Sequence, residues 1–231
     1  MRKAINIIAI SVVALVIIGA FWINESNYRG AGGGVKGPVD ADFQPGGTVT
    51  LDLSAGEYII RGSSDSKIRV RYTYSDYVKD TASINLKTDG NKATIAVDGP
   101  SSEFRCEIDV PQHTNLAGKL SAGILRVSDV EGDKDFESRA GLMKIDVGDA
   151  SMYKTVEASV TSGNLQARPW HTHKPGLFRS FNHYGSGQYA LRAHVTAGNL
   201  IISESDAEDV RRDREPRRPI PPTPPRREPT E

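Results

Sequence analysis

The chain has 231 residues, enough for one domain of roughly 150–170 residues with extensions at both ends. It carries 29 basic and 29 acidic side chains, so its formal charge is zero and no overall field favours nucleic acid as a partner. Only 38% of the residues are hydrophobic whereas 22 are glycine, and this composition favours a thin, turn-rich β-structure over a thick globular core.

The N-terminal segment predicts a membrane anchor. Residues 4–23 form a nearly unbroken apolar run, and a helix of that length, at about 1.5 Å per residue, spans the core of a bilayer. Arg2 and Lys3 precede the run, so the N-terminus (1–3) is expected in the cytoplasm and the rest of the chain in the periplasm or outside the cell. Ile18-Gly19-Ala20 is also an acceptable cleavage sequence, which leaves a cleaved signal peptide as the alternative.

Two further segments are expected to lie outside the fold. Residues 24–42 include a glycine-rich stretch, which predicts a flexible linker with a reach of about 20–25 Å. Residues 206–231 are rich in proline and arginine, contain too little apolar surface to fold, and are expected to be extended or disordered. This tail is either a basic arm that touches anionic envelope polymer or lipid headgroups, or a solvated extension without such a contact.

The body of the chain (43–205) repeats one short phrase: a small residue, a glycine, and apolar residues two and four positions after the glycine. The five copies contain the glycines Gly56, Gly123, Gly141, Gly163 and Gly198. Intervals of 18 and 22 residues between copies fit one coil of three short strands, with glycine at the corners, where positive φ angles are needed. The repeats predict an all-β, single-domain β-solenoid; a β-sandwich with Greek-key turns is the alternative.

The glycine phrases and three other segments carry a family resemblance. The segments are Asp109-Val110-Pro111, the run from Gly176 to Phe181, and the run from Gly187 to Val195. With them the chain resembles the bacterial putative-adhesin domain family, whose function is unknown and whose members are associated with the cell envelope. The resemblance covers about Val49 to Ser203. It implies a β-solenoid and an exported location, and it implies no catalytic or binding residue.

Several residues could act as nucleophiles or metal ligands, but a buried or solvated side chain without such a role is the favoured interpretation for each. Cys106 alternates with apolar residues, so it is expected to be a buried free thiol. His171 and His173, with His183, could chelate a transition metal, yet solvated imidazoles on an insertion at residues 169–187 are the better interpretation. We therefore predict neither a metal site nor a cofactor.

Two groups of acidic residues are interpreted in the same way. One group lacks the spacing of a calcium loop and is expected to form a solvated turn: Asp129, Glu131, Asp133 and Asp135. Asp129, Asp146 and Asp149 could lie on stacked strands as in polysaccharide-cleaving enzymes. Such enzymes need clustered acids and a basic residue in a groove, and a non-catalytic role is the favoured interpretation, so no enzymatic activity is predicted.

The densest patch typical of recognition surfaces combines aromatic residues with arginine, and it comprises Trp170, Phe178, Arg179, Phe181 and Tyr184. These side chains either contact an envelope polysaccharide or protein, or they cap the end of the β-structure. The favoured function is a non-catalytic, membrane-anchored envelope protein used for binding or surface assembly. An ectodomain that senses envelope stress is the first alternative, and a polysaccharide-active enzyme is the second.

Overall fold

A computed structural model describes residues 38–73, 82–100 and 104–204. The expected cytoplasmic N-terminus, the anchor, the disordered tail and most of the linker lie outside these ranges. No helix in the described part of the chain is long and apolar enough to cross a membrane.

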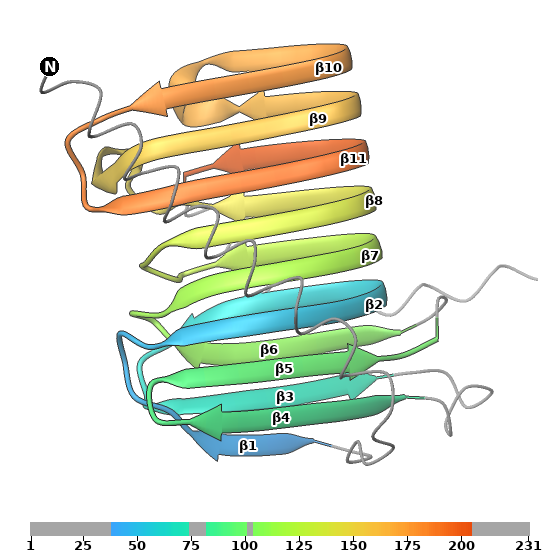
Figure 1. Cartoon of the computed structure of the whole chain (residues 1–231), viewed down its shortest axis with the longest axis vertical. Coiled ribbons are helices and arrows are strands. Elements are labelled where there is room, and N and C mark those ends of the chain that lie inside the picture. Colours follow the sequence, from blue (N-terminus) through green and yellow to red (C-terminus); the bar gives the residue numbers. More distant parts are fainter. Residues whose placement is uncertain (1–37, 74–81, 101–103, 205–231) are drawn as a thin grey trace, which may run out of the picture. The chain divides into compact units, whose positions relative to one another are not determined.

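The described residues form an all-β fold with two short 3-10 turns, η2 (Ala150–Met152) and η3 (Arg168–Trp170) (Figure 1). The strands are β1 (Val39–Asp42), β2 (Thr48–Ser63), β3 (Lys67–Thr73), β4 (Ser83–Asp89), β5 (Lys92–Asp98), β6 (Arg105–Pro111), β7 (Asn115–Ser128), β8 (Lys134–Asp146), β9 (Tyr153–Ala167), β10 (Thr172–Tyr184) and β11 (Tyr189–Ser203).

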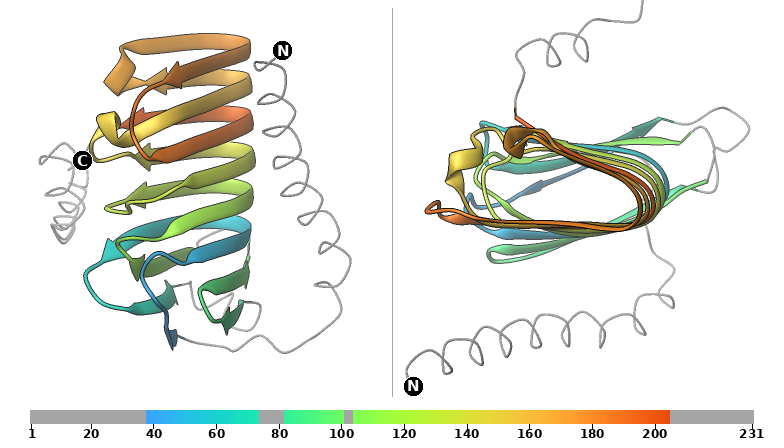
Figure 2. Two further views of the ribbon diagram at one scale, coloured as in Figure 1. Left: turned by 60° about the vertical axis from the view of Figure 1, so that its left-hand side comes forward. Right: turned by 90° about the horizontal axis from the view of Figure 1, so that it is seen from above.

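The long strands bend back on themselves, and the bends lie over one another (Figure 2). In the parallel register of β2, β7, β8, β11 and β9, the phrase glycines form one column, which contains Gly56, Gly123, Gly141, Gly198 and Gly163. Their φ angles lie between 118° and 159°, which side chains with a Cβ rarely adopt. Glycine therefore permits a sharp bend inside a continuous strand, and each bent strand supplies two arms to the fold.

The strands pair in the order β1-β3-β6-β2-β7-β8-β11-β9-β10, with the β4–β5 pair joined to β2. The pairs from β2 to β9 along this path are parallel, whereas β10 is antiparallel to β9. β11 is the last of the described strands along the chain, yet it pairs with both β8 and β9. The described strands thus belong to one open sheet.

This arrangement corrects the expected β-solenoid. The repeating unit is one long strand bent at glycine, not a coil of three short strands with corners. The units also do not stack in chain order, because the interval between Gly163 and Gly198 contains β10, and the chain then returns as β11 between β8 and β9. The expected insertion at residues 169–187 is accordingly ordered structure, composed largely of η3 and β10.

The core lies between the two arms of the bent strands. Alternate residues of each arm point inward and are stacked by the parallel register; one such column contains Leu165, Leu200, Met143, Leu125 and Tyr58, all nearly inaccessible to solvent. Cys106 belongs to the same column and is a buried free thiol, as the alternation predicts. Burial in this apolar core raises the pKa of the Cys106 thiol to about 12.

Candidate functional site at the β10 end of the sheet

β10 is the last strand at one end of the sheet, and it pairs only with β9 among the described strands (Figure 1). Most of its side chains are exposed. Leu177, Phe178 and Tyr184 are 61%, 80% and 74% exposed, and Met152 on η2, at 37%, is the other large exposed apolar side chain of the described residues. Exposed apolar residues therefore concentrate on this strand. We call η3, His171 and β10 together the β10 end surface.

Long polar side chains close the end of the core, which no further strand of the described residues covers. The register places Arg179 opposite Val160 and Lys174 opposite Leu165, on the side of the sheet that faces the core. Arg179 Nε donates a hydrogen bond to the Pro175 carbonyl oxygen (2.7 Å), and Lys174 Nζ donates one to the Ser180 carbonyl oxygen (2.7 Å). Each bond links one arm of β10 to the other across the bend. These links satisfy two carbonyl groups of an otherwise open strand.

An aromatic cluster covers the neighbouring part of the core. The Trp170 ring centroid lies 5.5 Å from that of Phe181 and 5.1 Å from that of His183. Trp170 and Phe181 are partly buried and pack against the core. The patch predicted from sequence is thus divided in the structure: Trp170 and Phe181 pack inward, while Phe178, Arg179 and Tyr184 are exposed.

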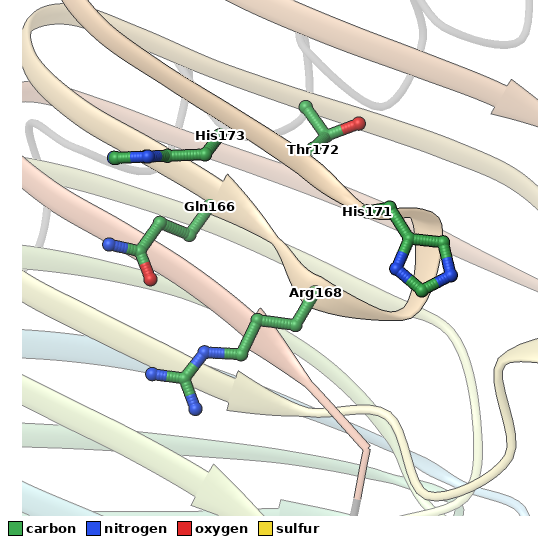
Figure 3. A pocket seen from close by; sticks show the side chains of 5 residues that line it. All are labelled: Gln166, Arg168, His171, Thr172 and His173. Carbon is green, nitrogen blue, oxygen red and sulfur yellow. The ribbon is translucent and has the colours of Figure 1, made fainter.

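A shallow, open hollow of about 330 Å³ lies beside η3, lined by Gln166, Arg168, His171, Thr172 and His173 (Figure 3). Gln166 and His173 face each other across the β9–β10 register, and their side chains lie on the same side of the ribbon as that of Arg168. His171 lies apart on the η3 turn, with a left-handed φ of 50°. The lining is polar and basic, which suits an anion better than a cation.

The three histidines considered as metal ligands do not converge. His171 and His173 line different parts of the hollow, and the His183 ring contacts Trp170. Within the described residues, no group of three or more His, Cys, Asp or Glu side chains is placed to hold a metal ion.

The acidic candidates bind neighbouring groups. Glu131 contacts His113 (3.1 Å), the Asp133 carboxylate accepts a hydrogen bond from the Ala190 N–H (2.8 Å), and Asp135 lies 3.8 Å from Arg192. Asp146 accepts from the Gly148 N–H, and Asp149 caps η2 by accepting from the Ser151 N–H. Asp129 has a left-handed φ of 57°. These contacts give the acids structural roles in turns and between strands.

The charge distribution contains a signal that the sequence interpretation did not use. No Asp or Glu occurs between Glu157 and Glu204, a segment that includes most of β9 and all of η3, β10 and β11. Its basic residues are Arg168, Lys174, Arg179 and Arg192. Glu157, opposite Asn182 in the β9–β10 register, is itself paired with Arg192 (3.3 Å). The β10 end surface is consequently both apolar and basic.

A buried lysine lies away from this surface. Lys134 is only 2% exposed, and its Nζ donates hydrogen bonds to the carbonyl oxygens of Val130 (2.8 Å) and Gly132 (3.3 Å) and to the Tyr153 hydroxyl (2.5 Å). Burial lowers the pKa of Lys134 to about 8 and raises that of Tyr153. The pair closes part of the core and is almost inaccessible to solvent.

No protein-family model and no curated protein match the chain. Solved structures similar to it include a putative cell adhesion protein from Clostridium sporogenes, with 13% identity and a TM-score of 0.47, covering 73% of this chain and 99% of the other. A putative adhesin from Bacteroides fragilis has 8% identity and a TM-score of 0.28, with coverages of 75% and 98%. One from Parabacteroides distasonis has 10% identity and a TM-score of 0.22, with coverages of 74% and 71%. These names agree with the resemblance to putative adhesins found in the sequence.

Proposed function

We propose that the chain is a non-catalytic, membrane-anchored protein of the cell envelope, whose adhesin-like β-domain binds a partner through the β10 end surface. The observation that carries the proposal is the exposure of Leu177, Phe178 and Tyr184 on a terminal strand. Exposed apolar groups that gather on one face of a protein, among polar residues, are typical of interaction sites. The apolar run at residues 4–23 supports the anchor, and the glycine-rich linker would let the domain reorient relative to the membrane.

The stacked strands suit a binding role because they hold the β10 end surface on a rigid support. Every strand from β2 to β9 along the path has at least two hydrogen-bonded neighbours, and one continuous set of buried side chains fills the space between the arms. Side chains on regular strands are held more precisely than side chains on loops. The acids considered as catalytic groups are engaged in turns, and the hollow beside η3 contains basic and neutral side chains.

The test is an attachment assay with cells that display the full chain at matched surface levels. The variant L177S/F178N/Y184S removes the exposed apolar groups, while Met152→Ser removes the comparable group outside β10. We expect the triple variant to lose attachment to cells or isolated envelopes by about tenfold or more, since interface hot spots are each worth about 2 kcal/mol or more. Met152→Ser should behave like the unmodified chain. Equal attachment by all three proteins would contradict the proposed function, and so would a change confined to envelope-stress transcription.

A further inference from the structure

We propose that the partner of the β10 end surface is an anionic lipid surface, which the Leu177–Phe178 tip enters while Arg168, Lys174 and Arg179 face the headgroups. This inference rests on the proposed function, because it names the chemistry of the partner for the same surface. It starts from the coincidence of apolar exposure and basic charge on β10.

The exposed tip lies at the bend of the terminal strand. Leu177 and Phe178 directly follow Gly176, the residue of β10 that lies opposite Gly163 in the glycine column. Phe178 has a φ of 52°, a left-handed conformation that is unfavourable for a bulky side chain. The strand therefore retains a strained aromatic residue at the bend, and its side chain is 80% exposed. Backbone strain of this kind tends to occur at functional sites, where another interaction compensates for it.

Charge favours an anionic partner over a second copy of the chain. β10 contains Lys174 and Arg179 and no acidic residue, so pairing two copies through this strand would bring like charges together. At the other end of the sheet the terminal strands are β1 and β4. β1 carries Asp40 and Asp42, but it is only four residues long and Asp42 lies 3.9 Å from Lys67, whereas β4 is seven residues long and carries both Lys87 and Asp89. A head-to-tail contact would therefore offer the 13-residue β10 two shorter strands. One of them has an acid with a basic neighbour, and the other carries a lysine of its own.

Among anionic partners, the exposed side chains favour lipid over polysaccharide. Sugar rings stack on accessible faces of Trp or Tyr, yet the Trp170 ring is engaged by Phe181 and His183. Tyr184 is exposed, but it is the last residue of β10 and lies away from the bend, so no second exposed Trp or Tyr accompanies it on this strand. The most exposed apolar groups at the bend are instead an aliphatic and a benzyl side chain, which can enter the acyl region of a bilayer. Lys174 and Arg179 flank the bend, and Arg168 lies at the η3 end of the same surface, so basic side chains are available to the headgroups at both places. The open edge of β10 would remain hydrated at the level of the headgroups.

The experiment uses the full chain held in zwitterionic nanodiscs and measures its binding to separate vesicles. Vesicles with about 30% phosphatidylglycerol or cardiolipin are compared with purely zwitterionic vesicles, and salt concentration is varied because Debye screening weakens headgroup attraction. We expect binding to anionic vesicles that decreases with salt. The double variant K174Q/R168Q should weaken vesicle binding by about 20-fold, because each basic residue that is removed accounts for about fivefold.

The decisive variant is Phe178→Asn, because asparagine tolerates the left-handed conformation and removes the apolar ring. It should unfold at the same or higher denaturant concentration as the unmodified chain and yet bind anionic vesicles about tenfold less tightly, as expected for loss of one inserted apolar side chain. Leu177→Ser should also weaken binding. Met152→Ser is the apolar control. Arg139→Gln, on the bend of β8, is the basic control. If the chain contacts vesicles through the end of the sheet, this variant should bind normally, whereas contact along the side of the sheet would weaken its binding.

The inference would be overturned by no vesicle binding, by equal binding to zwitterionic vesicles, by unchanged binding of Phe178→Asn and Leu177→Ser, or by self-association that accounts for the signal. Binding to a purified anionic polysaccharide in place of vesicles would also overturn it. In each case, if β10 substitutions still abolish cell attachment, the proposed function stands and only the lipid partner is wrong. If they change neither vesicle binding nor attachment, both proposals fail.

Discussion

Gly163 lies against Gly198 in the parallel register of β9 and β11, and a Cβ atom added at Gly163 would stand 1.7 Å from the Gly198 carbonyl oxygen. The same relationship recurs along the column: a Cβ at Gly141 would stand 1.9 Å from the Gly123 carbonyl oxygen, and one at Gly123 would stand 2.0 Å from that of Gly56. Glycine is thus required for two reasons, the positive φ of the bend and the close approach of the neighbouring backbone.

The first prediction is that Gly163→Ala destabilises the domain by about 3 kcal/mol, since left-handed backbone strain adds to overpacking against a backbone atom. Gly176→Ala is the matched control. Gly176 also has a positive φ, 111°, but the nearest atoms to its added Cβ belong to the flexible Arg179 guanidinium. Gly176→Ala should lower the free energy of unfolding by only about 1 kcal/mol, the cost of the backbone strain alone. Urea unfolding followed by circular dichroism measures both, and equal losses would show that the contact between neighbouring backbones is unimportant.

The second prediction concerns the aromatic cluster at the end of the core. Trp170→Ala removes a partly buried ring that contacts Phe181 and His183, so we expect a loss of about 2 kcal/mol in the free energy of unfolding, less than for a fully buried aromatic residue. Tyr184→Ala, at a side chain 74% exposed, should change it by less than about 0.5 kcal/mol. An unchanged unfolding curve for Trp170→Ala would mean that its ring does not cap the core and is available to a partner.

The glycine phrase carried enough information to predict an all-β body and the residues of its column. Its period-two apolar positions face the core in the structure, as at Leu125 and Leu165. The order of the strands could not be predicted, because the phrase is nearly identical in β8, β9 and β11, and each strand could pair in the same register with the others. Only the fold shows that β10 runs antiparallel and that β11 lies between β8 and β9.

The candidate site was predicted in composition but not in geometry. Aromatic and arginine residues between Trp170 and Tyr184 indicated a cap or a partner surface, and no period distinguished the two. Phe178 and Phe181 differ by three positions, so alternation places them on opposite faces, but it does not tell which of the two packs against the core. Phe178 also has a left-handed φ at the bend of β10. Local backbone conformation of this kind has no signature in the apolar pattern.

The third prediction is that Cys106 is unreactive in the folded protein. Its side chain is buried and its pKa is raised to about 12 by burial, so the nucleophilic thiolate is scarce at neutral pH. Labelling with a disulfide reagent at pH 8 should be at least about 100-fold slower in buffer than in denaturing urea, because reaction requires opening of the core. Comparable labelling rates under the two conditions would contradict the burial of Cys106.

The fourth prediction is a rise in stability with pH that depends on Lys134. Its pKa is lowered from 10.5 to about 8 in the folded state, so between these values the unfolded chain binds more protons than the folded one. The free energy of unfolding therefore rises with pH through this window, with a slope of at most about 1.4 kcal/mol per pH unit. Cys106, whose ordinary pKa is 9.0, and the buried Tyr58 and Tyr153 have raised pKa values and act in the opposite direction. Stability should consequently increase from pH 8 to 9, level off, and fall above pH 10.

Lys134→Met isolates the contribution of the lysine from those of the thiol and the phenols. The variant keeps an unbranched side chain of similar length and has no group that titrates, so its free energy of unfolding should lack the rise between pH 8 and 9. The free energy of unfolding of the unmodified chain should then rise steadily relative to that of the variant up to about pH 10, because Lys134 loses its proton in the folded state. Urea unfolding at half-unit pH steps measures this difference. A difference that stays constant with pH would show that Lys134 titrates normally and that its ammonium group is hydrated in the folded protein.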